Sequence, residues 1–158
     1  MISLKPYLRA APLLIGACLV LAGCGPKVDT HPGQPVTKRR ALLQETLRTF
    51  EPMGLIVRGK NPYVAADFQA LADKLQTLST QPWVYFPPGS TYAPSRAKSA
   101  VWQQSAQFKQ AQDTYIKAAS DLAVAAKTGS LDVIRPAYMR LGDSCAACHK
   151  SFRGPLAL

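Results

Sequence analysis

Apolar side chains recur at steps of three and four residues along four stretches of the chain, which is the period of an amphipathic helix. Segments rich in proline and glycine separate these stretches. The pattern predicts helices that begin near residue 36, cover about 64–78 and 96–128, and begin again after Ser130 as an N-cap. With short connections between neighbours, four such helices favour an all-α fold, an antiparallel four-helix bundle.

Proline and glycine mark the points where the helical pattern is weakest. Pro52 and Gly54 predict that the first helix kinks or ends early, since proline removes a main-chain donor and crowds the preceding turn. Pro136 and Gly142 predict local bends in the last helix for the same reason. Four prolines and several aromatic residues within 80–95 predict a long connection that packs against the bundle.

The last helix has the most regular apolar stripe. Its members follow heptad spacing and are Leu131, Ile134, Tyr138, Leu141, Cys145, Cys148 and Phe152. Both cysteines are therefore expected to face the core. The other three helices carry similar stripes, on which we expect Leu43, Leu47, Phe50, Phe68, Leu71, Leu75, Leu78, Val101, Phe108, Tyr115 and Leu122.

The composition fits one globular domain that follows an export signal. The 158 residues are 47% apolar and 18% charged, which is too apolar for a disordered chain. Lys5 and Arg9 precede an apolar run over residues 10–22, which is short for a membrane span and typical of a signal peptide. The run ends in Leu-Ala-Gly-Cys, which is similar to the lipobox of bacterial lipoproteins, and this likeness implies cleavage before Cys24 and lipidation of its thiol.

The export signal sets the expected organisation and location. We expect a lipoprotein-type signal peptide over residues 1–23, a flexible tether over 24–35 with a solvated His31, and the bundle over 36–158. The mature protein is expected in the periplasm, anchored to the membrane through Cys24, or soluble there after ordinary cleavage nearby. It keeps a net charge of +8, from 17 basic and 9 acidic residues, yet export argues against nucleic acid as the partner.

The sequence Cys145-Ala146-Ala147-Cys148-His149 has the C-x-x-C-H form that attaches c-type haem. On a helix, Cys145 and His149 lie one turn apart on the same face. Two thioether bonds to the haem edge can therefore hold the imidazole beneath the iron. The motif predicts one covalent haem c, bound through Cys145 and Cys148, with His149 as the metal ligand.

Three other interpretations of the cysteine pair have less support from the sequence. A thiol-redox pair usually lies at a helix N-terminus, whereas this one lies deep in the last predicted helix. A structural zinc ion needs four side-chain ligands, and the mature chain adds only His31 and Cys24 to the motif. A disulfide across two helical residues has poor geometry and leaves His149 unexplained.

The motif and its surroundings resemble the cytochrome c prime family, the class II c-type cytochromes, over about residues 38–153. The residues that carry the resemblance are Cys145, Cys148 and His149 with Lys60-Asn61-Pro62-Tyr63, Ala65-Ala66, Leu78, Pro82-Trp83, Trp102, Phe108-Lys109-Gln110, Gly129 and Leu131-Asp132. The resemblance implies a four-helix bundle with a single haem near its C-terminus.

The resemblance places Leu43 over the distal face of the haem, by its offset from Pro62-Tyr63. Leucine cannot coordinate iron, so a five-coordinate, high-spin iron with an apolar distal side is expected. No methionine follows the motif. Met53 and Met139 are the other methionines of the mature chain, and Met53 is the stronger rival ligand; at about 15 Å from Leu43 along the helix, it would need a different register.

The resemblance also assigns basic residues to the haem. Arg39 and Arg40 match positions that pair with a haem propionate, and Arg96 and Lys98 are further candidates for that role. Arg153 matches the arginine on the proximal face of the haem. A cation at a helix C-terminus that offsets the macrodipole is the alternative interpretation of Arg153.

These features predict a gas-binding haem protein that scavenges or buffers nitric oxide and also binds carbon monoxide. It is not expected to be an enzyme. The alternative function is one-electron transfer with a redox protein partner, and a thiol oxidoreductase is a remote third possibility. The family likeness also raises a homodimer, for which Leu47 or Leu71 could supply contacts.

Overall fold

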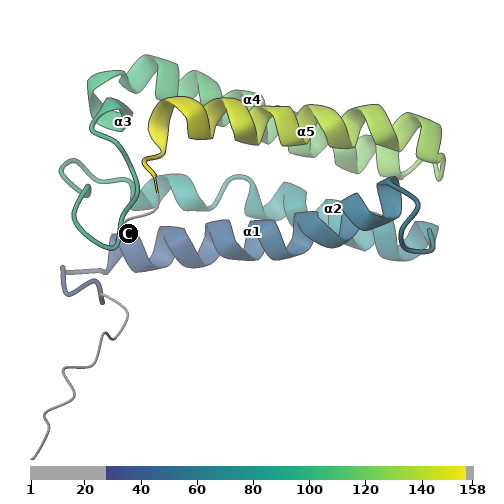
Figure 1. The fold of residues 1–158 in the computed structure, drawn as a ribbon, viewed down its shortest axis with the longest axis horizontal. Helices are drawn as coiled ribbons and strands as arrows, with labels where there is room; N and C mark the ends of the chain where they lie inside the picture. The colour runs from purple at the N-terminus through teal and green to yellow at the C-terminus, as the bar shows by residue number, and fades with distance from the viewer. Residues whose placement is uncertain (1–27, 156–158) are drawn as a thin grey trace, which may run out of the picture.

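A computed structural model describes residues 28–155 of the chain. Its main helices are α1 (Pro35–Val57), α2 (Ala65–Leu78), α4 (Ser105–Ala126) and α5 (Leu131–Phe152). They form a bundle in which α5 returns beside α1, with its C-terminal end near the N-terminal half of α1 (Figure 1). The long connection holds a 3₁₀ helix, η1 (Pro82–Tyr85), and the short α3 (Ala100–Gln103). The all-α four-helix bundle expected from the sequence is confirmed. The signal peptide and Cys24 lie outside the described residues.

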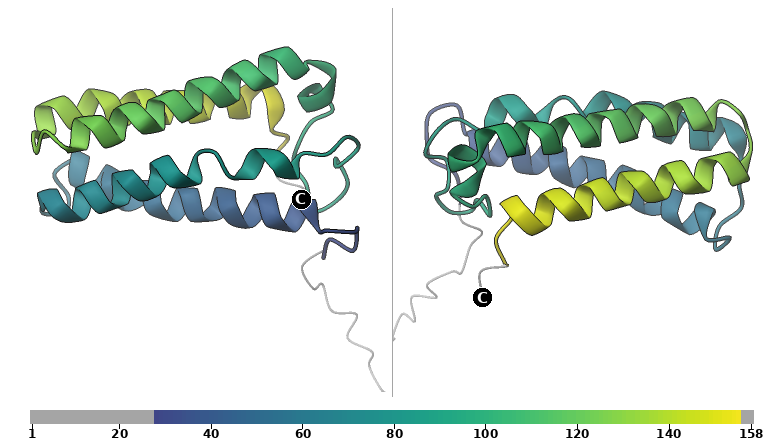
Figure 2. Two further views of the ribbon diagram at one scale, coloured as in Figure 1. Left: turned by 180° about the vertical axis from the view of Figure 1, so that it is seen from behind. Right: turned by 90° about the horizontal axis from the view of Figure 1, so that it is seen from above.

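The core of the bundle is built from the apolar stripes of all four long helices. Its largest fully buried apolar side chains are Met53, Phe68, Leu75, Leu122, Ile134 and Leu141. Burial of each such side chain stabilises the fold by about 1.5–3 kcal/mol. Both views of Figure 2 show the pair α4 and α5 packed over the pair α1 and α2. Between residues 28 and 155, no helix is both long and apolar enough to cross a bilayer.

The sequence predicted that α1 kinks or ends early at Pro52. The early end is wrong, because the helix continues to Val57. The Pro52 ring points to solvent, where the missing main-chain hydrogen bond costs least. The residues just beyond it, Met53, Ile56 and Val57, are buried in the core. Packing of this last turn therefore outweighs the local preference of proline to end the helix.

Gly54 allows α1 to pass close to α5. A Cβ atom at this position would lie 2.3 Å from the Tyr138 hydroxyl oxygen and 3.2 Å from Cζ of the same ring. That ring cannot move freely, because it is buried and stacks on Phe50 with 4.3 Å between centroids. The small size of glycine is thus required by the contact between the two helices.

We expect Gly54→Ala to destabilise the protein by about 1 kcal/mol, because overpacking costs more than the roughly 1 kcal/mol of helix propensity gained. Urea unfolding measures the change. Gly142→Ala is the matched control, since its Cβ would meet Phe50 at an ordinary 3.5 Å. It is expected to stabilise α5. Equal gains in the two variants would contradict the close approach at Gly54.

The expected third helix over 96–128 is divided in the structure. Residues 96–99 are not helical, and a break at Gln104 (φ −118°, ψ 50°) separates α3 from α4. Residues 96–99 pair outside the helix instead, where the Lys98 amide donates to the carbonyl oxygen of Phe152 at 2.9 Å. The predicted end of this helix at Gly129 agrees with its positive φ of 68°.

The last helix, α5, is continuous through Pro136 and Gly142. Its predicted stripe is the buried face, with Leu131, Cys145 and Cys148 half-buried at the margins. Ser130 is the N-cap in extended conformation, although its side chain makes no capping hydrogen bond. α5 thus carries the cysteine motif on a regular helix whose inner face is fixed by the core.

Residues 28–34, which fall in the expected tether, contact the bundle. Asp29 is buried, and its Oδ2 accepts hydrogen bonds from the amides of Val36 (2.9 Å) and Thr37 (3.3 Å). Its Oδ1 accepts from the His31 amide at 3.0 Å. The His31 ring stacks on Tyr92, 3.4 Å between centroids, so the ring expected to be solvated is partly covered. Asp29 therefore caps the N-terminus of α1 from seven residues away.

Asp29→Ala is expected to lower the Tm by about 3 °C at neutral pH, because α1 loses its cap. Burial raises the pKa of Asp29, but the donors from His31, Thr37 and Val36 outweigh it and hold the pKa below its ordinary value. A lowered folded-state pKa stabilises the protein above the unfolded pKa and stops doing so as pH falls through the folded pKa. The Tm difference between variant and parent should therefore shrink below about pH 4. A pH-independent difference would contradict the role of the charge.

Candidate haem site

The cysteine motif occupies the last two turns of α5. Cys145 and Cys148 are free thiols and half-buried, and His149 is exposed. Cys145 packs against the main core, whereas Cys148 packs against a second, smaller cluster of buried side chains. The two thiols therefore lie where two apolar clusters meet, and the histidine lies one turn beyond Cys145 on the same helix.

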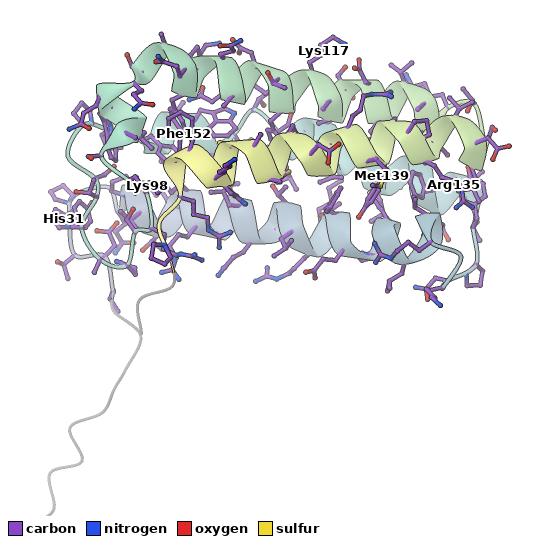
Figure 3. All side chains as sticks on the ribbon, turned by 45° about the horizontal axis from the view of Figure 1, so that its top comes forward. His31, Lys98, Lys117, Arg135, Met139 and Phe152 are labelled. Atoms are coloured by element: carbon purple, nitrogen blue, oxygen red, sulfur yellow. The ribbon has the colours of Figure 1, made fainter. Side chains whose placement is uncertain are left out.

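Aromatic side chains dominate the second cluster. Phe108 packs on Phe152 and Phe86 with centroid distances of 5.1 and 5.2 Å, and Trp83 lies 6.0 Å from Phe108 and from Tyr115. The Trp83 indole donates to the Ser79 carbonyl at 2.7 Å, which fixes the ring. Figure 3 shows Phe152 and Lys98 together at the C-terminal end of α5, with Met139 well away along the helix. Aromatic walls beside paired thiols suit a flat, apolar macrocycle.

Burial shifts both thiols away from redox reactivity. It raises the pKa of Cys145 to about 11, although the Ser144 hydroxyl acts in the opposite direction. It raises the pKa of Cys148 as well. Redox-active thiols require a lowered pKa and usually a helix N-terminus. These cysteines have the opposite environment, which counts against the thiol oxidoreductase interpretation.

A buried hydroxyl at the site lacks a hydrogen-bond partner. Within residues 28–155, the phenol oxygen of Tyr115 is fully buried and receives or donates no hydrogen bond. Burial, with the nearby Cys145, raises its pKa to about 12, and proximity to the Thr46 hydroxyl offsets this in part. Thr46 donates its own proton to the Leu42 carbonyl at 3.0 Å, so it leaves the phenol without a well-formed hydrogen bond. Buried polar groups are rarely left unsatisfied. An unsatisfied phenol beside free thiols and aromatic walls fits a site that a haem completes.

Two arginines, Arg153 and Arg96, lie near the His149 imidazole. Arg153 Nη1 lies 3.5 Å from His149 Nδ1, one helical turn away. Burial lowers the pKa of His149, and the charges of Arg153 and Arg96 lower it further. A lowered pKa favours the neutral imidazole, which is the form that binds metal ions.

The candidate distal residue and the rival methionines lie in different environments. Leu43 is half-buried in the N-terminal half of α1. Met53 is fully buried in the main core, ten residues further along the helix. Met139 is 57% exposed on α5. Packing already accounts for Met53, so the register in which it could be a ligand gains no support.

Arg39, a predicted propionate partner, is a buried residue of α1 whose side chain reaches the loop that precedes α3. Its guanidinium donates to the Tyr85 carbonyl (2.9 Å), to the Ser90 hydroxyl (2.6 Å) and carbonyl, and to the Ser95 hydroxyl (2.6 Å). It also stacks over Phe86, 4.5 Å from the ring centroid. Arg39 thus anchors the loop to α1, while Arg40 is exposed. The propionate role of both residues stays a prediction.

Arg96 and Lys98 lie close to the cysteine motif. Their side chains donate hydrogen bonds to main-chain carbonyls there. Arg96 donates to the Gly154 carbonyl from Nε (3.0 Å) and Nη2 (2.7 Å), and Lys98 Nζ donates to the Lys150 carbonyl at 2.9 Å. Lys98 therefore caps the last turn of α5, and Arg96 holds the chain just after the helix ends at Phe152. Sequence spacing did not reveal this, because the partners lie more than 50 residues apart.

The two leucines considered for a dimer contact differ in exposure. Leu47 is 52% exposed and lines a surface groove of about 700 Å³ together with Phe50, Pro52 and Leu55. Leu71 is partly buried against the main core. Leu47 is therefore the better placed of the two, and a homodimer stays a prediction.

The bundle and the C-x-x-C-H motif at its last helix together define a c-type haem protein of the four-helix type. Residues 34–153 match the family described as Cytochrome C'. Over 122 residues the chain is 36% identical to the cytochrome c' of Alcaligenes xylosoxydans xylosoxydans, an alignment that covers 77% of this chain and 94% of the relative. This chain belongs to the cytochrome c' family.

Solved structures agree with the fold. One is a leucine-to-glycine variant of cytochrome c prime from Alcaligenes xylosoxidans with carbon monoxide bound, and another is a ferrous arginine-to-lysine variant of the same protein with bound nitric oxide. Each matches with a TM-score of 0.74 and 34% identity, and each match covers 80% of this chain and 98% of that chain. Proteins of this family carry a covalent c-type haem, so Cys145 and Cys148 hold the cofactor of this chain.

Proposed function

We propose that this protein reversibly binds nitric oxide and carbon monoxide at a five-coordinate haem iron and serves to scavenge or buffer nitric oxide. The observation that carries the proposal is the hydrocarbon side chain of Leu43 at the expected distal position. The burial of Met53 in the core adds to it, since a buried, packed thioether is not free to coordinate. His149 would then be the one protein ligand of the iron.

The chain's own side chains favour some gases over others. When bound, the haem supplies an iron with one open coordination position. Leu43 offers no hydrogen-bond donor there, and stable oxygen binding relies on such a donor more than carbon monoxide or nitric oxide does. Arg153 Nη1 lies 3.5 Å from His149 Nδ1, so Nε2 is the nitrogen that would be free to bind the iron.

The related structures with carbon monoxide and nitric oxide bound support this choice of ligands. They are variants at a leucine and at an arginine. The family resemblance assigns a distal leucine to Leu43 and a proximal arginine to Arg153 in this chain. We therefore propose that gas binds next to Leu43 or next to Arg153.

An anaerobic titration of the ferrous protein tests the proposal. The haem absorption spectrum should change on addition of carbon monoxide and of nitric oxide, each with saturation at one ligand per haem. Oxygen should oxidise the iron without forming a stable complex. A ferrous spectrum that neither gas alters would refute gas binding and leave electron transfer as the function.

Electron transfer is the second candidate, and one observation favours it. Four cationic side chains, Arg96, Lys98, Lys150 and Arg153, gather at the C-terminal end of α5 beside the exposed His149. Between residues 28 and 155, no carboxylate pairs with any of them. Such a surface would attract an acidic redox partner, so the rate of reduction by one should fall steeply as ionic strength rises.

We also propose export to the periplasm, a lipid on Cys24 and no catalytic turnover, on the sequence features given above. Fractionation of cells that express the full chain tests the lipid. The parent should sediment with membranes, and Cys24→Ser should appear in the soluble periplasmic fraction. If the parent protein is soluble after export, the proposed signal peptide stands and the proposed lipid anchor on Cys24 is refuted.

A further inference from the structure

Residues 96–98, called here the strap, pair with the chain end that follows α5. The Lys98 amide donates to the Phe152 carbonyl at 2.9 Å, and the Gly154 amide donates to the Arg96 carbonyl at 2.7 Å. Ala97 and Arg153 form an antiparallel bridge between these two bonds. A short two-stranded contact thus holds the end of the haem-bearing helix.

Side chains of the strap extend this contact. The last carbonyls of a helix have no partner within the helix and need an external donor. Here Lys98 Nζ donates to the Lys150 carbonyl in the last turn at 2.9 Å. The Arg96 guanidinium holds the segment that follows the helix, through the carbonyls of Gly154 (3.0 and 2.7 Å) and Pro155 (3.1 Å). Charged donors at carbonyls make strong hydrogen bonds, and cations suit a helix C-terminus. The strap therefore acts as the C-terminal cap of α5.

The strap is itself fixed to α1. The Ala97 amide donates to the Ser95 hydroxyl at 3.0 Å, and the same hydroxyl accepts from Arg39 Nη2 at 2.6 Å. Arg39 is buried and also binds Tyr85 and Ser90. A continuous set of hydrogen bonds therefore runs from α1, through the loop and the strap, to the last turn of α5.

His149 lies in that last turn, because the Arg153 amide closes the turn on the His149 carbonyl at 3.0 Å. We propose that Arg96 and Lys98 are positioning residues that hold this turn and so slow the release of His149 from the haem iron. The inference rests on the proposed gas binding. In such a release, the bond from iron to His149 Nε2 would break when nitric oxide bonds to the iron, and the imidazole would leave neutral with its electron pair.

The test uses ferrous holoprotein and nitric oxide. Arg96→Gln removes the guanidinium fork, Arg96→Lys keeps the charge without the fork, and Lys98→Gln removes the second cap. Arg140→Gln, exposed on α5, is the control for charge. Stopped-flow absorption and electron paramagnetic resonance follow conversion of the six-coordinate nitrosyl form to the five-coordinate form. Amide hydrogen exchange at Arg153 reports the last turn independently of any gas.

Arg96→Gln and Arg96→Lys are each expected to speed the nitrosyl conversion about tenfold. Amide exchange at Arg153 should become faster by about the same factor, because the loss of one charged hydrogen bond has an effect of that size. Lys98→Gln should act in the same direction, and Arg140→Gln should match the parent. If Arg96→Lys had the same rates as the parent, the positive charge alone would account for the effect. That result would overturn the proposal that the hydrogen bonds of the strap hold the turn. Unchanged rates and exchange in all strap variants would also overturn it.

The outcomes separate the two proposals. If the parent binds no nitric oxide, the proposed function fails, while faster exchange at Arg153 in the strap variants still shows that the strap holds the turn. If the parent binds nitric oxide and the variants do not differ, the strap inference fails alone. Circular dichroism and haem content confirm folding, and the exposed Lys98 offers a variant that folds if Arg96→Gln does not.

Discussion

Replacement of both Cys145 and Cys148 by alanine is expected to leave the protein without covalent haem. Each thiol forms one thioether bond, so a single replacement leaves one bond and the double replacement leaves none. Intact-protein mass spectrometry after acid–acetone extraction measures the result directly. The parent should retain the mass of one haem, and the double variant should have the mass of the polypeptide alone.

Ala146→Ser is the matched control, because residue 146 lies between the two cysteines and is exposed. It should keep the haem. The double variant is also expected to lose thermal stability, since a group that binds only the folded state stabilises it and would be missing. A double variant that still held haem after extraction would show that the attachment lies elsewhere in the chain.

Leu43→Met is expected to convert the iron from five-coordinate and high-spin to six-coordinate and low-spin. A thioether at this position can take the open coordination place, which leucine cannot. If the methionine occupies the iron in about 99% of molecules, the apparent affinity for carbon monoxide falls roughly 100-fold. Absorption spectra of the ferrous protein and a carbon monoxide titration measure both effects.

Leu42→Met is the matched control for Leu43→Met. Leu42 is also half-buried on α1, but a shift of one residue turns the side chain about 100° around the helix. It should remain high-spin and bind carbon monoxide as the parent does. A high-spin Leu43→Met protein with unchanged affinity would show that Leu43 does not face the iron.

The sequence predicted most of the fold because the helices are defined by local periodicity. The stripe of α5 from Leu131 to Phe152 lies on the buried face, and α2 matches its expected bounds within one residue. The early end expected for α1 is wrong because Pro52 carries only a local signal, whereas the burial of Met53 and Val57 depends on helices distant in sequence. Tertiary packing decided that boundary.

The candidate site was predictable to a similar degree. The cysteine motif is a local spacing, so the sequence places the haem on α5 without knowledge of the fold. The loop contacts of Arg39 involve residues 46 to 56 positions away, and no spacing rule reveals them. The same holds for the strap at Arg96 and Lys98 and for the cap at Asp29, which was not expected at all.

The optical spectrum of the purified ferrous protein, recorded before and after addition of carbon monoxide, tests the central claim most directly. A covalent haem with His149 on one side and Leu43 on the other predicts a broad high-spin spectrum that carbon monoxide converts to a low-spin form. A sharp low-spin spectrum that carbon monoxide leaves unchanged would mean that a second protein ligand holds the iron, and would contradict the account.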